Sequence, residues 1–194
     1  MSSEFTLLNT ITTPNPKSHG KIRARKTGEY HPLQIYDDYL DSDDFDKIAQ
    51  VIMGNNIPWY YNTGVVEPNE KTFQFCHEVY NEHCPRSDVY GNIFPLLNRI
   101  NPAAIDRIKI NCQPRTDTIH VNKMHVDAYD KRTYSGILYI NDNDGYTEFE
   151  DGQIVQSKAN RFITWPSYIR HRGTTCTDQH TRVLINLVYY PKEI

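Results

Sequence analysis

The chain has few cysteines and no long apolar run. Its four cysteines among 194 residues include no C-x-x-C pair, so they do not indicate a disulfide scaffold, and we expect reduced thiols. No apolar stretch approaches the roughly 20 residues that cross a bilayer. Residues 1–10 have neither the basic start nor the apolar core of a signal peptide. These absences argue against a membrane protein, and we expect a soluble protein in the cytoplasm.

The chain also lacks a strong charge of either sign. The formal net charge is −3 and the isoelectric point is near 6.2, so no global field attracts a polyanion. A small basic cluster near the N-terminus is typical of a solvated tail and contains Lys21, Arg23, Arg25 and Lys26. Composition therefore does not favour nucleic acid as a partner, although it leaves that possibility open, and it does not indicate an oligomeric state.

The length fits one domain with an N-terminal extension. Residues 1–28 are rich in Ser, Thr, Pro, Asn and Lys and show little periodicity. We expect them to lie along the domain surface or to be partly disordered. Residues 29–194 are predicted to form a single domain.

Two segments have the pattern of helices. Asp41 can cap a helix whose first turn holds further acids, Gly54 can end it, and apolar residues recur between them at helical spacing. These apolar residues are Phe45, Ile48, Ala49 and Ile52. A second helix is predicted from about Ser87 to Arg99, with Pro95 near its start or at a kink.

Most of the remaining chain has the pattern of β-strands. The predicted strands are Leu33–Leu40, Trp59–Asn62, Lys71–Tyr80, Ile105–Gln113, Tyr134–Asn141, Thr147–Gln156, Arg161–Trp165 and Arg182–Tyr190. Because helices come early and strands come late, we expect an α+β domain that is mainly β. Its core would be an antiparallel sheet or a closed sandwich.

Three residues stand out as metal ligands. His125 and Asp127 are separated by one residue, so both side chains project from the same face of an extended segment. His171 comes 46 positions after His125 and would enter from a separate strand edge. Two imidazoles and one carboxylate form the facial set that binds non-haem Fe(II) and leaves positions open. The spacing of His125 and Asp127 alone is weak evidence for a metal site, because chance gives roughly one His-x-acid pair at this composition.

Arg182 opens a strongly β-branched strand. Arg182, Leu184 and Asn186 share one face of that strand. A guanidinium at the start of an apolar strand is expected to point toward the mouth of a barrel or toward solvent. The alternative is a charge that protects an edge strand from aggregation.

Other polar and aromatic clusters have simpler explanations. His120 is best interpreted as a loop histidine. His77 and His83, near Cys84, lack the second pair that would close a zinc site. Trp59-Tyr60-Tyr61 is either an aromatic platform for nucleic acid or, as we favour, sheet packing or a substrate lid.

Six landmarks carry a family resemblance. They are His125-Val-Asp127, Leu138-Tyr-Ile-Asn141, Thr147-Glu-Phe149, Trp165-Pro-Ser167, His171-Arg-Gly173 and Arg182. In this order they resemble the Fe(II)- and 2-oxoglutarate-dependent dioxygenases, most of all the prolyl-hydroxylase-like branch and its compact phage and bacterial forms. The similarity covers about residues 105–190, and more weakly residues 33–54. It implies a double-stranded β-helix, or jelly-roll and cupin-like, core with the N-terminal helices packed on one sheet.

The resemblance also implies roles for particular residues. Arg182 would pair with the distal carboxylate of 2-oxoglutarate, for which a planar two-pronged donor is suited. Tyr139 would add a phenol hydrogen bond, or else be a core tyrosine. Gln113 stands where relatives carry a tyrosine beside the cosubstrate, and Asn186 would hold a water or the inner carboxylate. The iron ligands would be His125, Asp127 and His171.

The substrate side is less defined. The resemblance implies hydroxylation of a peptidyl residue, proline first, with O2 as a second cosubstrate and with succinate and CO2 as coproducts. The candidate substrate contacts are Tyr60, Arg132, Trp165 and Arg170. An oxygenase of nucleic acid or of a small molecule is an alternative, as is a non-catalytic jelly-roll binding module. Asn160 replaces a family glycine before the strand that leads to His171, and asparagine tolerates the same left-handed turn.

Overall fold

The computed structural model describes residues 33–68 and 70–192, so the predicted extension over residues 1–28 lies outside the described residues. These described residues form three helices and eleven strands. They are β1 (Gln34–Tyr36), α1 (Ser42–Met53), β2 (Tyr60–Asn62), β3 (Gln74–Asn81), β4 (Cys84–Pro85), α2 (Val89–Asn92), α3 (Phe94–Ile100), β5 (Ala104–Pro114), β6 (Tyr134–Tyr139), β7 (Tyr146–Phe149), β8 (Ile154–Gln156), β9 (Phe162–Pro166), β10 (His171–Gly173) and β11 (Thr181–Tyr190).

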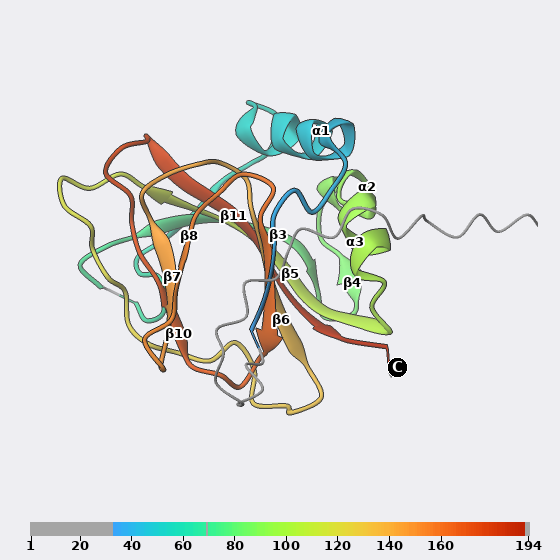
Figure 1. Cartoon of the computed structure of the whole chain (residues 1–194). Coiled ribbons are helices and arrows are strands. Elements are labelled where there is room, and N and C mark those ends of the chain that lie inside the picture. The colour runs from blue at the N-terminus through green and yellow to red at the C-terminus, as the bar shows by residue number, and fades with distance from the viewer. Residues whose placement is uncertain (1–32, 69, 193–194) are drawn as a thin grey trace, which may run out of the picture.

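The strands form a larger and a smaller antiparallel sheet. The larger sheet has the order β1-β9-β6-β11-β5-β3-β2, with β4 paired to β3, and the smaller has the order β10-β7-β8. In Figure 1 the smaller sheet stands on one side of the larger one and α2 and α3 lie on the other. This arrangement is the double-stranded β-helix that the sequence predicted, with the N-terminal helices on one sheet.

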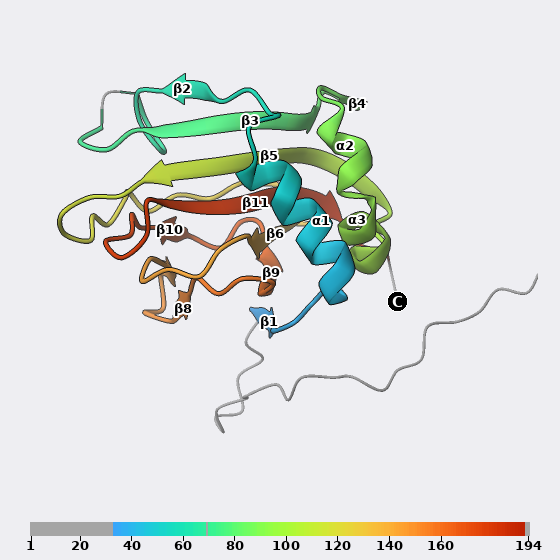
Figure 2. The same cartoon turned by 90° about the horizontal axis from the view of Figure 1, so that it is seen from above.

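Two apolar cores account for these layers. One lies between the larger sheet and the helices, where Ile48 of α1 and Leu96 of α3 pack with Ile110 of β5 and Ile185 of β11. Figure 2, seen from above, shows α1 crossing over β5 and β11. The other core contains Leu184 with residues of β6, β7, β8 and β9. Alternate residues of β11 therefore face the helices or the space between the sheets.

The helices begin and end close to the predicted positions. Asp41 is the N-cap of α1, although its side chain makes no capping hydrogen bond, and Gly54 follows the last turn. The second predicted helix is divided at Ile93 into α2 and α3. Pro95 lies in the first turn of α3, where its missing N–H has no helical partner to lose.

Two predicted strands are wrong in extent, and of the first, Leu33–Leu40, only Gln34–Tyr36 forms a strand. The stretch from Thr147 to Gln156 is a hairpin, β7 and β8, because residues 150–153 turn the chain and Gly152 adopts a positive φ of 83°. Such a backbone favours glycine. Two short strands, β4 and β10, were not predicted from the sequence.

Asn160 confirms the expected left-handed turn, with φ of 58°. Its side chain also fixes the N-terminal part of the domain. Nδ2 donates to the carbonyl of Leu40 at 2.8 Å, and Oδ1 accepts from the N–H of Leu40 at 2.9 Å. An asparagine here therefore supplies both the turn and a two-bond clamp to the chain before α1.

The remaining expectations from composition can be compared with the described residues. All four cysteines are free thiols, as predicted. Among residues 33–68 and 70–192, no helix has the length and apolarity that spanning a membrane requires.

Candidate metal centre

Two backbone hydrogen bonds hold His125 and His171 side by side. The N–H of each donates to the carbonyl of the other at 2.9 Å, which joins β10 to the segment before β6. The imidazole centroids are 4.5 Å apart. Residues 46 positions apart in the sequence thus present their rings together because a short antiparallel bridge joins their backbones.

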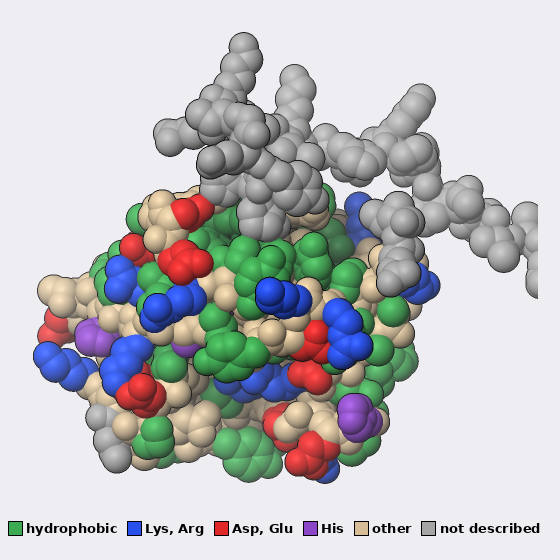
Figure 3. All heavy atoms as spheres, turned by 90° about the horizontal axis from the view of Figure 1, so that it is seen from below, with side chains coloured by type: hydrophobic (Ala, Val, Ile, Leu, Met, Phe, Trp, Pro, Cys, Tyr) green, Lys and Arg blue, Asp and Glu red, His purple; other side chains and the backbone are tan. Residues whose placement is uncertain are grey.

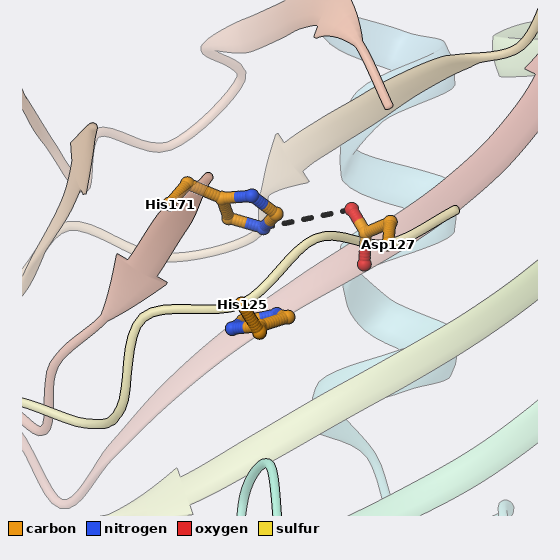
Figure 4. Close-up of side chains that lie close together, drawn as sticks. All are labelled: His125, Asp127 and His171. Atoms are coloured by element: carbon orange, nitrogen blue, oxygen red, sulfur yellow. Dashed lines mark ion pairs between the residues drawn. The ribbon is translucent and has the colours of Figure 1, made fainter. Parts of the chain in front are cut away.

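Asp127 completes the group. Nitrogen and oxygen atoms of His125, Asp127 and His171 that could bind a metal all lie within 4.8 Å of one another. His171 Nε2 is 3.5 Å from Asp127 Oδ2, as the dashed line in Figure 4 marks, and the His125 ring lies beside them. The structure therefore brings together the three predicted ligand residues.

The outer nitrogens of both imidazoles face backbone carbonyls. His125 Nδ1 is 3.3 Å from the carbonyl oxygen of Lys123, and His171 Nδ1 is 3.2 Å from that of Ile169. A proton on Nδ1 can be donated to the carbonyl, which leaves the Nε2 lone pair for a metal. This is the usual way in which proteins orient a ligating histidine.

The carboxylate of Asp127 is held by three side chains. Ser135 Oγ donates to Oδ2 at 2.7 Å, Arg107 Nη2 donates to Oδ1 at 3.3 Å, and Asn186 Nδ2 lies 3.5 Å from Oδ2. Burial opposes ionisation, but the interaction with His171, the charge of Arg107 and the Ser135 hydrogen bond outweigh it and lower the pKa of Asp127. The carboxylate is therefore oriented and kept in the anionic form that binds metal.

His171 is fixed by burial and by aromatic contacts. Trp165 lies against its ring at 4.8 Å between centroids, and Phe149 lies at 6.1 Å. Burial lowers the pKa of His171, although Asp127 opposes the shift, which favours the neutral imidazole. A neutral imidazole is the form that ligates a metal.

These donors fit non-haem iron. Two imidazole nitrogens and one carboxylate converge from one side, and they line a cavity of about 570 Å³, which includes space open to solvent. The open side would leave coordination positions for a cosubstrate and for dioxygen. A second group of close side chains, Asp144, Cys176 and Asp178, is a loop cluster in which both carboxylates accept backbone N–H bonds.

Arg182 lies inside the same cavity and is not exposed to solvent. It is 3% exposed and donates to Ser157 Oγ at 2.8 Å and to Thr147 Oγ1 at 3.1 Å. Of the two expected directions, solvent is wrong, and the guanidinium lies inside the barrel rather than at its surface, because β11 is central in its sheet and this face is covered by the smaller sheet. The edge-strand explanation is excluded for the same reason.

The guanidinium of Arg182 has no carboxylate partner among the described residues. Burial lowers the pKa of Arg182, although the neighbouring Tyr139 opposes the shift, and an arginine side chain stays protonated in proteins. Gly173 leaves space for it, because a Cβ there would lie 3.3 Å from Nη1. A buried cation of this kind favours an anionic ligand in the cavity.

Three other predicted cosubstrate residues surround Arg182 or the triad. Gln113 lines the cavity, accepts from Arg182 at 3.5 Å, and has a buried Nε2 without a partner among the described residues. Asn186 also lines the cavity. Tyr139 is fully buried and donates to Thr147 Oγ1 at 2.7 Å, with its ring 5.5 Å from the guanidinium carbon of Arg182. Tyr139 therefore supports Arg182 from behind, and its direct hydrogen bond to a cosubstrate stays a prediction.

The predicted substrate residues are not gathered around the cavity. Trp165 is fully buried behind His171, so the expected substrate contact is wrong for this residue. Arg132 is exposed and is paired with Asp130 at 2.7 Å, and Arg170 is exposed. Tyr60 is 62% exposed on the edge strand β2. The substrate roles of Tyr60, Arg132 and Arg170 stay predictions.

Among the polar residues of β5 that face away from the helices, only Gln113 was predicted from the sequence. Arg107, Lys109, Asn111 and Gln113 occupy alternate positions, while Ile108 and Ile110 between them enter the helix-side core. Polar residues at every second position of a strand with apolar neighbours were a visible signal. Their significance depends on β5 lying in the middle of the larger sheet, with β11 and β3 on either side.

Comparisons with known proteins agree with the fold. No protein-family model matches the sequence, and no curated protein matches it. A prolyl-4-hydroxylase from Pseudomonas putida has a TM-score of 0.54 and 12% identity over 84% of this chain and 94% of that chain. A prolyl hydroxylase from Trichoplax adhaerens, in complex with a hypoxia inducible factor peptide fragment, has a TM-score of 0.55 and 13% identity over 82% and 83%.

A third structure has a different activity on the same fold. The non-haem α-ketoglutarate-dependent epimerase SnoN of nogalamycin biosynthesis has a TM-score of 0.58 and 10% identity over 82% of this chain and 76% of that chain. At these identities the similarity establishes the fold, and the chemistry has to be argued from the cavity itself.

Proposed function

We propose that this chain is an Fe(II)- and 2-oxoglutarate-dependent dioxygenase that hydroxylates an unactivated C–H bond. The observation that carries the proposal is a single cavity with two complementary features. It holds a His-Asp-His group whose ligand atoms lie within 4.8 Å of one another, and it holds the buried cation of Arg182 without a carboxylate partner among the described residues. The first feature suits iron and the second suits the distal carboxylate of the cosubstrate.

The chain's own residues would bind and orient the reactants. His125, Asp127 and His171 would hold the metal, and Arg182 would donate to the distal carboxylate, with the free Nε2 of Gln113 as a further donor. When bound, iron, 2-oxoglutarate and dioxygen supply the oxidant for the C–H bond and leave succinate and CO2 as coproducts. The Arg182 end of the cavity is shielded from bulk solvent, because Tyr139, Thr147 and Arg182 are all at most 3% exposed. Exclusion of water there strengthens the charge pairing.

A peptidyl residue, with proline as the first candidate, is the substrate that we propose. Two similarly folded enzymes are prolyl hydroxylases, and one of them was determined with a peptide fragment. The exposed Tyr60 on the edge strand β2 is a contact that an extended peptide could use. Whichever peptidyl residue is hydroxylated, the reaction would need iron, 2-oxoglutarate and O2.

A small molecule is the second candidate substrate, because SnoN, of nogalamycin biosynthesis, has the same fold. Nucleic acid is less favoured. On the face drawn in Figure 3, acidic and basic side chains are interspersed with apolar ones, so this face offers no continuous basic surface.

An anaerobic titration tests the proposal. Fe(II) is added to the metal-free protein, 2-oxoglutarate follows, and the visible charge-transfer band of the chelate is recorded. We expect the band to appear and to saturate at one equivalent of each. A protein that binds neither would be a non-catalytic jelly-roll module. Release of succinate and CO2 on admission of air, screened with prolyl peptides and with small molecules, then separates the substrate classes.

A further inference from the structure

Lys109 is a cation on the cavity wall that the proposed chemistry does not use. It lines the cavity from β5, opposite Asn186 of β11 and Glu78 of β3. Gln113, the β5 residue opposite Arg182, is four residues further along the same row. At about 3.3 Å per residue, Lys109 is about 13 Å along the strand from the Arg182 end. The two cations therefore mark different parts of one cavity.

The ammonium of Lys109 is unmatched within the described chain. It makes no hydrogen bond or ion pair with any described residue, whereas Arg107, two positions away, is paired with Asp127 at 3.3 Å. Asp127 would also be a metal ligand, so its negative charge would be balanced by the metal and would not pair with Lys109. Burial lowers the pKa of Lys109, although the Cys76 thiol and the carboxylates of Asp127 and Glu78 oppose that shift. A partly buried ammonium that lacks an anion gains from a ligand that brings one.

The proposed cosubstrate does not supply this anion. Its distal carboxylate would pair with Arg182, and its keto acid would neutralise the metal together with Asp127. Lys109 then has no ion-pair partner among the described residues, although it lies on the cavity wall. Asn111 is two positions from Lys109 on the same face and lines the cavity, and its Oδ1 already accepts from Cys76 at 3.5 Å. The amide nitrogen of Asn111 is a second possible donor from the same wall of the cavity.

We propose that Lys109, assisted by Asn111, binds a carboxylate of the substrate, and this inference rests on the proposed function. The oxidised C–H bond would then belong to a molecule or peptide residue that carries a carboxylate close to it. A single ammonium balances the single charge of a carboxylate, whereas a phosphate dianion would leave a net negative charge in a largely buried site, which is costly. The carboxylate can be that of a free acid, that of a peptide C-terminus or that of a neighbouring acidic side chain.

Binding to the anaerobic protein tests this inference without turnover. The protein is loaded with Fe(II) and 2-oxoglutarate, and isothermal titration calorimetry compares each probe with its neutral partner. The first pair is N-acetyl-proline and N-acetyl-prolinamide, and the second is a tripeptide that ends in proline as the acid and as the amide. The third pair is a peptide with an internal proline beside glutamate or beside glutamine. We expect at least one acid to bind about ten- to a hundredfold tighter than its neutral partner.

Variants assign the preference to Lys109. Lys109→Met removes the charge at similar length, and Lys109→Gln is a second neutral variant. Lys47→Met on α1, whose side chain is 76% exposed, loses the same charge at the surface and is the matched control. The acid preference should disappear in both Lys109 variants and persist in Lys47→Met. The affinity for 2-oxoglutarate should change by less than about threefold in all of them.

The outcomes separate this inference from the proposed function. If wild-type protein does not bind Fe(II) and 2-oxoglutarate, the proposed function fails and the inference fails with it. If the cosubstrate binds but no acid is preferred, or the preference survives in the Lys109 variants, only the inference is overturned. A loss of 2-oxoglutarate affinity in Lys109→Met would show that Lys109 serves the cosubstrate, which also overturns it. Among the acids, the pair that responds identifies the source of the carboxylate.

Discussion

Arg107 on β5 donates to the carboxylate of Asp127 at 3.3 Å, so a cation from the larger sheet holds a candidate iron ligand in the metal-free protein. The Arg107 side chain is 30% exposed and that of Asp127 is 6% exposed. Loss of one partner of a largely buried pair leaves the other with its desolvation cost. The guanidinium therefore supplies the positive charge beside Asp127 that a bound metal would otherwise supply.

Arg107→Met should lower the free energy of unfolding of the metal-free protein by about 1–3 kcal/mol. In an Asp127→Asn background the same substitution should cost less, because the buried negative charge is already gone. Denaturant unfolding of the two single variants and the double variant measures this coupling. Saturating Co(II) should reduce the Arg107→Met deficit, since the metal restores a positive charge beside Asp127. Additive losses, unaffected by metal, would contradict the stabilising role of this pair.

His125→Ala should abolish Fe(II) binding and succinate formation, because a pair of ligands no longer forms the facial set. The matched control is His120→Ala. His120 is five residues away and is linked to the fold through its backbone, whose N–H donates to Thr175 Oγ1 at 2.9 Å. The control should keep both properties. Unchanged turnover in His125→Ala would remove the iron assignment.

Arg182→Met should raise the 2-oxoglutarate requirement about a hundredfold, because charge-assisted hydrogen bonds to the distal carboxylate are lost. Fe(II) binding without cosubstrate should stay the same. Anaerobic titrations of the visible band at fixed Fe(II) give both values. Arg99→Met is the control, because Arg99 lies over the Tyr39 ring at 5.6 Å on the helix side. An equal change in both variants would indicate a general loss of fold.

The residues that gather in the cavity could be predicted from sequence because their signals are local or ordered. His125 and Asp127 share a face at a spacing of two, and Arg182 opens a strand whose alternation is clear. The burial of Arg182 could not be predicted in this way. It depends on β7, β10 and β5 surrounding the start of β11, and pairing across 30 or more residues has no local sequence signal.

Lys109 is a second residue whose environment could not be predicted from the sequence pattern alone. Its alternation with Ile108 and Ile110 was visible in the sequence, but an alternating strand has two faces, and only the topology shows which of them the helices cover. The prediction that Trp165 contacts the substrate was wrong for a related reason. A large aromatic next to a ligand motif is equally consistent with a substrate contact and with support of the ligand, and burial decides for support.

Trp165 offers a direct optical test of the metal site. The chain has two tryptophans. Trp165 lies 4.8 Å from the His171 ring, whereas Trp59 packs against the helix-side core. An open-shell metal on His171 accepts energy from an excited indole at such short range, so Co(II) or anaerobic Fe(II) should quench the fluorescence of Trp165. Trp59→Phe should keep the metal-dependent quenching, and Trp165→Phe should lose most of it while still binding metal by calorimetry. If the quenching were instead lost in Trp59→Phe and kept in Trp165→Phe, the bound metal would lie on the other side of the larger sheet, away from His171.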